Sequence, residues 1–422
     1  MDTSGTKKVV VIGGGFAGIN FIKTLWRKPG FEITLVDVNN YNFFPPLLYQ
    51  VATGFLEPSS ISYPFRKFLR HKSNVHFRMG KLLKVLPDEN KVILSNGQLD
   101  YDFLIMATGA ESNFFGKENV KRHAIPMKTL SDALAMRNLL LNRLEEASRT
   151  TDVELKKKLL TVVVAGAGPT GVEISGMFAE MRQSIIQKDY PELGHGFSGI
   201  VLVDGGNAVL GPMDLKSQHY SKEALEKMGV KIHLNTMVED FDGETVTFKG
   251  TEPIQTKNLI WAAGVSAIPF DGIPKESFGP SRRLVVNEFN KVTGTENIFA
   301  LGDTCFQNTD SSFPKGHPQV AQVAIQHGKL LAENMGKPAN QWTRFKYNDK
   351  GAMAIIGRNK AVADIPKPKL HFQGFFAWAI WLFIHVMSLL TFKNRLRTFT
   401  NWLIAYFSKD QSFRMIIRPE EN

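Results

Sequence analysis

The chain has 422 residues, a formal net charge of +11 and 43% hydrophobic residues, which is enough for two or three domains with buried cores. Its single cysteine, Cys305, excludes an internal disulfide, a zinc ribbon, a cysteine-ligated iron–sulfur cluster and a two-cysteine redox centre. The positive charge is compatible with an acidic partner, either nucleic acid or an anionic membrane surface. Glycines at 13–18 interrupt the only apolar run near the amino terminus, so we expect no secretory signal and folding in the cytosol or an equivalent compartment.

The first chemical signal is a glycine pattern close to the amino terminus. Residues 9–12 are apolar and mostly β-branched, so they predict a buried strand, and three glycines follow at G-x-G-x-x-G spacing, Gly13, Gly15 and Gly18. The first permits a tight turn, the second lets backbone approach a pyrophosphate, and the third lets a helix pack on the strand. Residues 31–37 predict the next strand, which ends in Asp37, a carboxylate that can hold a ribose. These features predict a dinucleotide site without deciding which dinucleotide; a glycine-rich turn without a ligand is the alternative.

The same arrangement recurs about 150 residues later. Residues 159–165 predict a second buried strand, and the glycine spacing is repeated by Gly166, Gly168 and Gly171. Residues 200–204 predict a strand that ends in a carboxylate, Asp204, and residues 257–264 echo an earlier element at 101–109. Two such units indicate an internal duplication with two nucleotide domains.

The carboxyl-terminal part has a different composition. Residues 374–392 contain no Asp, Glu, Lys or Arg and are rich in Phe, Trp, Ile and Leu; basic residues and a second apolar segment at 402–407 follow. This length is at the threshold for a helix that spans a bilayer, but the aromatic and basic flanks equally fit helices that lie in the membrane interface. A buried dimer or core helix is the third alternative. We expect membrane attachment, with a preference for an anionic leaflet.

Five motifs, in chain order, resemble the two-dinucleotide-binding-domain flavoproteins of the pyridine nucleotide-disulfide oxidoreductase superfamily. They are Gly13-x-Gly15-x-x-Gly18, Ala107-Thr108-Gly109, Gly166-x-Gly168-x-x-Gly171, Ala262-Ala263-Gly264 and Gly302-Asp303. The resemblance implies an α/β fold with two Rossmann-like domains, the second inserted in the first. The implied divisions are an FAD-binding domain at 1–120 and 273–345, an NADH-binding domain at 121–272, and a membrane-binding and dimerisation region at 346–422.

The resemblance also implies two sets of cofactor-binding residues. For non-covalent FAD the set is Gly13, Gly14, Gly15, Phe16, Ala17, Gly18, Asp37, Leu82, Thr108, Gly109, Asp303, Ala321 and Gln322. For NADH the set is Gly166, Gly168, Pro169, Thr170, Gly171, Glu173, Asp204, Ala263 and Gly264. Asp204 can accept hydrogen bonds from a ribose 2′-OH and repels a 2′-phosphate, which favours NADH over NADPH.

The electron acceptor is indicated by the cysteine count and by residues 317–328. Members of the superfamily that reduce disulfides need a cysteine pair, and sulfide:quinone oxidoreductases need cysteines to carry sulfur, so Cys305 alone serves neither reaction. Residues 317–328 resemble the A-Q-x-A-x-Q-x-G element of the type II NADH dehydrogenases, which are NADH:quinone oxidoreductases. Gln322 and Gln326 are four residues apart, so they share one helical face and can present two amides to the carbonyl groups of a quinone. The alternative is two polar residues on a solvated helix face.

Glu173 has two readings that the sequence leaves open. One is an acid in the first turn that complements the helix dipole. The other, implied by the resemblance, is a catalytic residue near the nicotinamide and flavin that orients NADH or helps protons to reach the quinone.

Together these observations predict a membrane-associated NADH:quinone oxidoreductase that does not pump protons. Hydride passes from NADH to FAD, and a membrane quinone, ubiquinone or menaquinone, then takes two electrons; Glu173, Gln322 and Gln326 are the candidate catalytic residues, and no metal is required. We expect a homodimer on the cytoplasmic face of the cell membrane, attached monotopically in preference to a single span, with no nucleic-acid partner. The alternatives are a flavin-dependent NAD(P)H reductase of a soluble acceptor such as ferredoxin or rubredoxin, and a non-enzymatic flavoprotein that senses NADH.

Overall fold

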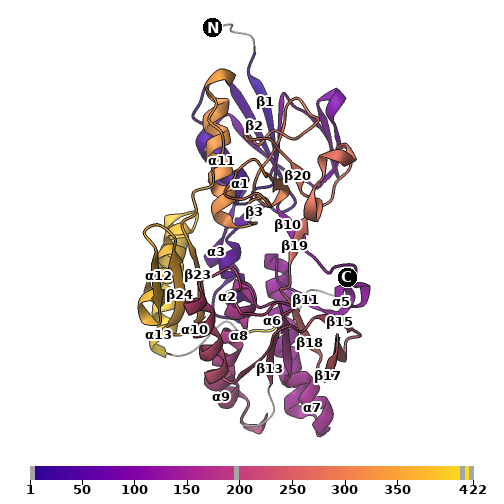
Figure 1. The fold of residues 1–422 in the computed structure, drawn as a ribbon, viewed down its shortest axis with the longest axis vertical. Coiled ribbons are helices and arrows are strands. Elements are labelled where there is room, and N and C mark those ends of the chain that lie inside the picture. The colour runs from indigo at the N-terminus through magenta and orange to yellow at the C-terminus, as the bar shows by residue number, and fades with distance from the viewer. Residues whose placement is uncertain (1–4, 194–198, 409–413, 418–422) are drawn as a thin grey trace. The chain divides into compact units, whose positions relative to one another are not determined.

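The computed structural model describes residues 5–193, 199–408 and 414–417, and the chain divides into two compact units (Figure 1). Unit 1 consists of the described parts of Met1–Phe43, Tyr63–Glu111 and Val265–Asp349. Unit 2 consists of those of Phe44–Ser62, Ser112–Gly264 and Lys350–Asn422. The major part of unit 2 is therefore inserted between two segments of unit 1, as the sequence predicted.

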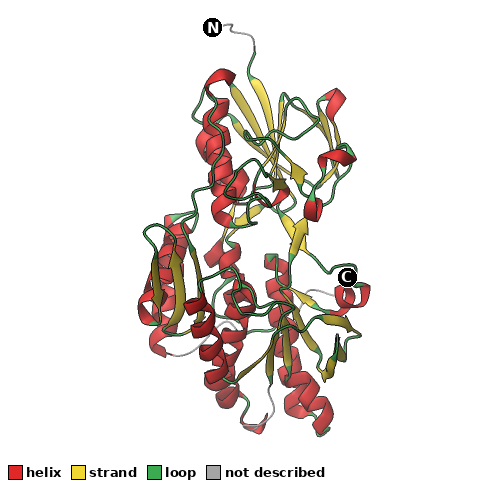
Figure 2. Cartoon of the chain, viewed as in Figure 1, coloured by secondary structure: helices red, strands yellow, loops and turns green. Residues whose placement is uncertain are grey.

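Unit 1 is built on a parallel five-stranded sheet in the order β21-β9-β1-β2-β5. The strands are β1 (Lys7–Ile12), β2 (Phe31–Asp37), β5 (Val75–Met79), β9 (Phe103–Met106) and β21 (Ile298–Ala300). Val9 of β1 aligns with Ile33 of β2 and with Phe103 of β9. The strands β1, β9 and β21 are mainly apolar because α1 (Phe16–Leu25), α11 (Ala321–Met335) and other segments cover the sheet (Figure 2).

Unit 2 repeats this design with a second parallel sheet in the order β11-β18-β12-β13-β14. Its strands are β11 (Ile125–Pro126), β12 (Val162–Ala165), β13 (Ile200–Val203), β14 (Val230–His233) and β18 (Asn258–Trp261). Its main helices are α6 (Leu130–Arg149), α8 (Pro169–Met181) and α10 (Leu215–Lys227). In each unit the strand before the glycine turn is the central strand of the parallel sheet. Each unit also contains an antiparallel three-stranded meander, which forms a separate sheet. The meander strands are β6 (Leu82–Leu86), β7 (Lys91–Leu94) and β8 (Gly97–Asp100) in unit 1, and β15 (Val238–Phe241), β16 (Thr245–Phe248) and β17 (Thr251–Gln255) in unit 2. The predicted α/β fold with two Rossmann-like sheets is confirmed.

The carboxyl-terminal part of unit 2 is a three-stranded antiparallel sheet followed by two helices. The strands are β23 (Ala352–Gly357), β24 (Lys360–Ile365) and β25 (Leu370–Gln373), and the helices are α12 (Phe375–Ser388) and α13 (Phe392–Ser408). The uncharged run at 374–392 therefore ends as a helix at Ser388, and α13 starts at a new cap, where the Thr391 hydroxyl accepts from the Asn394 N–H at 3.3 Å. Among the residues that the structure describes, none of the helices combines the length and the apolar character needed to cross a membrane.

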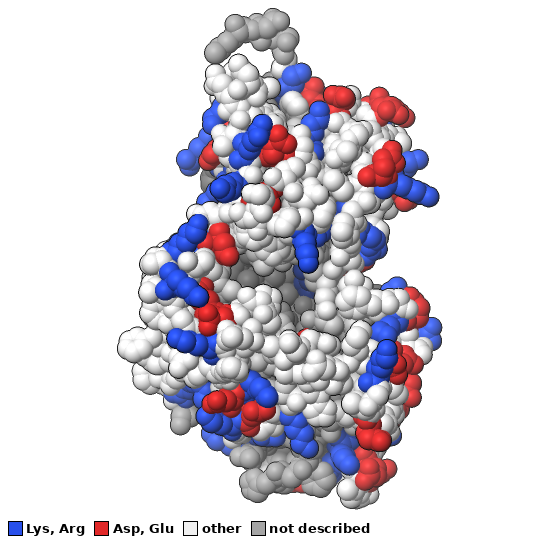
Figure 3. All heavy atoms as spheres, viewed as in Figure 1, with Lys and Arg blue, Asp and Glu red and all other residues white. Residues whose placement is uncertain are grey.

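The net positive charge is dispersed over the face in Figure 3. Lysine and arginine side chains lie there among aspartate and glutamate side chains. The predicted division of the chain into FAD-binding, NADH-binding and membrane-binding regions stays a prediction, since compactness does not reveal which ligand each part holds.

Candidate functional site

The glycine turn of unit 1 leaves one of its three glycines facing open space. Gly13 has a φ of +105°, and a Cβ there lies 2.1 Å from the carbonyl oxygen of Ala107. A Cβ on Gly18 lies 2.0 Å from the carbonyl oxygen of Gly13, whereas a Cβ on Gly15 meets no atom within 4 Å. The protein's own packing therefore requires Gly13 and Gly18, while the room at Gly15 fits the approach of a phosphate to the N-terminus of α1.

The turn of unit 2 has the same geometry. Gly166 has a φ of +107°, and its Cβ lies 2.4 Å from the carbonyl oxygen of Ala262; a Cβ on Gly171 lies 1.7 Å from the carbonyl oxygen of Gly166. Gly168 again meets no atom within 4 Å. Pro169 then occupies the first position of α8, where its missing N–H costs no helical bond. Each unit thus has one glycine with open space beside it at the start of a helix, and this geometry fits a phosphate.

The two predicted carboxylates fix these turns. Asp37 accepts hydrogen bonds from the Gly14 N–H at 2.7 Å and from the Asn39 N–H at 2.8 Å. Asp204 accepts from the N–H groups of Ala167 and Gly206, both at 2.6 Å. A carboxylate oxygen has more than one acceptor position, so both groups keep capacity for a ribose hydroxyl.

Further predicted FAD residues meet in unit 1 around a turn that starts at Gly302. The Thr304 hydroxyl bonds the Thr108 hydroxyl at 2.9 Å and accepts from the Gly109 N–H at 3.0 Å. Asp303, the predicted ribityl ligand, precedes Thr304 in this turn, so the structure brings it together with Thr108 and Gly109. These residues are far apart in the chain, but the strands that precede them, β9 and β21, are paired in the sheet.

The remaining predicted cofactor residues take ordinary places in the fold. Phe16 and Ala17 open α1, Leu82 opens β6 and is buried, and Thr170 lies in the first turn of α8. In unit 2, Ala263 packs beside the core of the second sheet, and the Gly264 carbonyl accepts from the Asn113 N–H at 3.0 Å.

Two residues that support the first site were not predicted. The His327 ring is buried, which lowers its pKa to about 3, and its neutral Nδ1 accepts from the Gly302 N–H at 3.1 Å. The Asn42 side chain donates to the Gly14 carbonyl at 2.7 Å. His327 stands at an unspecified position of the 317–328 element, and Asn42 lies in none of the predicted motifs. Each acts through a backbone group that only the fold brings near.

Ala321, Gln322 and Gln326 lie on α11, as expected for the predicted quinone face. The Tyr347 hydroxyl lies 3.5 Å from Gln322 Oε1. Gln326 bonds the backbone of Asn348 through both ends of its amide, at 2.9 and 3.0 Å. The two glutamines therefore have different surroundings within unit 1.

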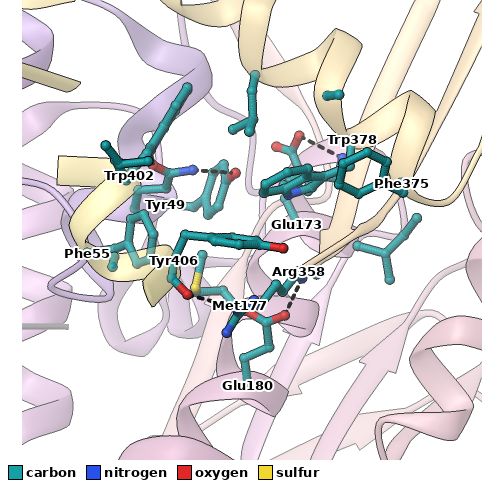
Figure 4. Close-up of a pocket in the computed structure, with 18 of the residues that line it drawn as sticks. Tyr49, Phe55, Glu173, Met177, Glu180, Arg358, Phe375, Trp378, Trp402 and Tyr406 are labelled. Atoms are coloured by element: carbon teal, nitrogen blue, oxygen red, sulfur yellow. Dashed lines mark hydrogen bonds between the residues drawn. The ribbon is translucent and has the colours of Figure 1, made fainter. Parts of the chain in front are cut away.

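Unit 2 contains a cavity of about 740 Å³ whose walls come from segments far apart in the sequence (Figure 4). These segments are α2 (Leu48–Ala52), α8, the hairpin of β23 and β24, α12 and α13. Most of the lining is aromatic or aliphatic, and its polar groups include Tyr49, Glu173, Glu180 and Arg358. A cavity of this composition fits a largely apolar ligand with a few polar atoms.

Comparison with known proteins decides the family. The pattern described as "Pyridine nucleotide-disulphide oxidoreductase" matches residues 7–328, and the "NDH2 C-terminal domain" matches residues 350–410. Two type II NADH:quinone oxidoreductases of Mycobacterium tuberculosis, NdhA and Ndh, are each 34% identical to the chain, over 96% and 95% of it and 88% of their own lengths. The chain belongs to the type II NADH:quinone oxidoreductases.

Solved structures agree with this fold. The structure of NDH2 from Plasmodium falciparum in complex with NADH has a TM-score of 0.88, covers 98% of this chain and 100% of its own, and is 23% identical. The sulfide:quinone oxidoreductase of Aquifex aeolicus has a TM-score of 0.71 at 20% identity, over 98% of this chain and 96% of its own.

In this type II NADH:quinone oxidoreductase, Glu173 faces the cavity. It is the fifth residue of α8, so the first-turn dipole reading does not describe it. Burial raises the pKa of Glu173 from its ordinary value of 4.5 to about 8, and the Ile355 N–H, at 3.5 Å, opposes this shift only weakly. The carboxyl is therefore protonated at neutral pH and can donate.

A hydrogen-bonded chain joins α13 to this wall. Trp402 Nε1 donates to Gln50 Oε1 at 2.7 Å, and Gln50 Nε2 donates to the Tyr49 hydroxyl at 2.9 Å (Figure 4). Burial, and next the charge of Glu173, raise the pKa of Tyr49 well above its ordinary value. Tyr49 is consequently a neutral hydroxyl, which accepts from Gln50 and keeps a proton that it can donate.

Proposed function

We propose that the chain catalyses the oxidation of NADH by a membrane quinone with FAD as its resident cofactor. The observation that carries this proposal is the pair of open phosphate cradles, one in each unit, together with a large apolar cavity that holds a protonated carboxyl. The balanced reaction is NADH + H⁺ + quinone → NAD⁺ + quinol.

The residues of unit 1 fit FAD. Room at Gly15, the N–H groups of α1 and the Asp37 carboxylate suit a pyrophosphate and a ribose, and Asp303 with Thr108 and Gly109 suits the rest of the molecule. FAD, when bound, supplies the two-electron redox chemistry. The protein orients the substrates, excludes water and holds protons.

NADH fits unit 2 through the cradle at Gly168 and the Asp204 carboxylate. Asp204 directly follows β13, and its carboxyl group would meet a 2′-phosphate there, so we propose selectivity for NADH over NADPH.

In this proposal the cavity of unit 2 binds the quinone, and Glu173 donates a proton there. The role of Gln322 and Gln326 as ligands for quinone carbonyl groups stays a prediction from the sequence. The proposed mechanism requires no metal and does not include proton translocation.

Membrane attachment through α12 and α13 supplies the quinone. Large apolar side chains at 392, 396, 399, 403 and 407 follow a helical spacing and are exposed, whereas Asn394 and Thr398 on the opposite face bond the Ser60 carbonyl at 2.9 and 3.2 Å. Lys393 and neighbouring arginines favour an anionic leaflet. We propose monotopic binding at the cytoplasmic face, with a homodimer formed through this region.

Stopped-flow spectroscopy tests the function. The membrane-extracted protein is mixed with NADH or NADPH and then with ubiquinone or menaquinone analogues. We expect flavin absorbance, bleaching by NADH, and rapid recovery with a quinone. Recovery only with a soluble ferredoxin or rubredoxin supports the reductase alternative, and a protein without flavin absorbance refutes both.

A further inference from the structure

Quinone reduction in this cavity needs a proton from solution. NADH contributes one proton and two electrons to the quinol, so the second proton of each turnover comes from water. The cavity walls are mostly apolar, and Glu173 is 9% exposed, so direct exchange of its carboxyl with bulk solvent is hindered. This inference rests on the proposed function and asks how that proton arrives.

A second carboxyl lines the same cavity on the same helix. Glu180 lies seven residues beyond Glu173 on α8, which is about two turns or ~10 Å along the axis. Unlike Glu173, it is partly exposed, and the next turn of the wall is formed by the polar residues Gln183 and Ser184. Burial thus decreases along α8 from Glu173 towards Glu180.

The hairpin of β23 and β24 holds Glu180 without neutralising it. The Arg358 backbone N–H donates to Glu180 Oε1, while the Arg358 guanidinium is directed to α13, where it donates to the Tyr406 carbonyl at 2.6 Å and lies 4.1 Å from the Tyr406 ring (Figure 4). Burial raises the pKa of Glu180, and the hairpin charges of Lys360 and Arg358 oppose that rise. The group can therefore bind a proton and release it.

Tyr49 lines the same cavity as the two carboxyl groups. Its hydroxyl is buried, and the charges of Glu173 and Glu180 both add to the rise of its pKa. A hydroxyl that accepts one proton while donating another transfers charge without ionising.

We propose that Glu180 is the proton-entry carboxyl of this cavity. It takes a proton from water at the Gln183 end and supplies it, through Tyr49 or a cavity water, to the Glu173 carboxylate. Before this step, Glu173 has given its own proton to a quinone oxygen. At each transfer one O–H bond breaks and another forms, and the proton that the quinol gains is replaced from solution. Glu180 therefore acts on the quinone only through Glu173, by positioning a proton for it.

The test compares E180Q, E180D and E180A with E223Q, which removes an exposed carboxyl of α10. We expect E180Q to slow quinone-dependent turnover about tenfold or more, with flavin reduction by NADH within about twofold of the parent. E180D keeps most of the turnover, and formate or acetate restores E180A in proportion to its protonated fraction as pH is varied. Flavin content and circular dichroism report folding of each variant.

Different outcomes separate the two proposals. Parent turnover in E180Q at all pH values, or a loss in E180A that no weak acid restores while E180D is active, overturns the entry role and leaves the quinone reaction intact. If E180Q does not fold, the turnover of E180D and the rescue of E180A by weak acids still test the entry role. A parent protein that reduces no quinone overturns the proposed function and this inference with it.

Discussion

The side-chain amide of Gln326 is bonded at both ends to the backbone of Asn348. Its Nε2 donates to the Asn348 carbonyl at 2.9 Å, and its Oε1 accepts from the Asn348 N–H at 3.0 Å. Asn348 lies two residues before the chain passes into unit 2 at Lys350. Gln326 therefore holds the end of unit 1, and a quinone at this amide competes with a backbone partner. Gln322 lies one turn earlier on α11, where the Tyr347 hydroxyl is 3.5 Å from its Oε1.

The two glutamines should consequently differ on substitution. Q326A removes two bonds from partly exposed backbone, so we expect a loss of about 1–3 kcal/mol in the free energy of unfolding. Q322A should instead raise the KM for quinone and leave flavin reduction by NADH unchanged. Thermal unfolding and stopped-flow measurements on both variants check this, and equal losses in both half-reactions for Q322A contradict a role in quinone binding.

Substitution of the two glycines that face open space, Gly15 and Gly168, should affect different cofactors. Gly15 and Gly168 have φ values of −74° and −71°, which alanine adopts, and a Cβ there meets no protein atom. G15A should fold but lose flavin, and G168A should keep flavin but raise the KM for NADH about tenfold or more, since a methyl group occupies the place of a phosphate.

G18A is the steric control for this pair, because its Cβ falls 2.0 Å from the Gly13 carbonyl oxygen. It should lower the thermal midpoint whether or not cofactor is added. Absorbance at the flavin band measures the flavin content of each variant, and steady-state kinetics measure its KM for NADH. A G15A variant with full flavin content contradicts the proposal that a phosphate of FAD lies at Gly15.

Glu173 should make stability depend on pH. Its folded pKa is about 8 and its ordinary value is 4.5, so between these values the folded protein keeps a proton that the unfolded chain has lost. Stability then falls as pH rises through this window and levels above about pH 8. E173Q cannot titrate, so the difference in unfolding free energy between parent and E173Q should decline over the window. A flat difference contradicts the buried neutral carboxyl.

The exposed apolar face of α13 should govern membrane binding. Phe392 and Phe407 are 77% and 75% exposed, and burial of a phenylalanine stabilises by about 1.5–3 kcal/mol. Replacing both by serine should weaken binding to anionic vesicles about tenfold or more. L215S, at an equally exposed site on α10, is the matched control. Vesicle co-sedimentation at two ionic strengths measures the effect, and unchanged binding refutes this face as the anchor.

Local patterns were sufficient to predict the two Rossmann-like units. The strand predicted at 31–37 is β2, and both glycine turns lie where their spacing placed them, because hydrophobic runs and glycine sterics act within a few residues. The uncharged run at 374–392 was less informative. The run is divided before Phe392 because the Thr391 hydroxyl caps α13 and because the Asn394 side chain donates to the Ser60 carbonyl. The composition of the run does not reveal either hydrogen bond.

The sequence by itself determined the family, the duplicated α/β fold and the two dinucleotide turns, since each depends on residues that are neighbours in the chain. The tertiary structure alone decided which polar groups work together. Glu173, Glu180, Tyr49 and Arg358 come from three segments and meet only when α8, α2 and the β23–β24 hairpin pack around one cavity. The raised pKa values of Glu173 and Glu180 follow from that burial, because the loss of water around a carboxyl group depends on its surroundings and not on its place in the chain.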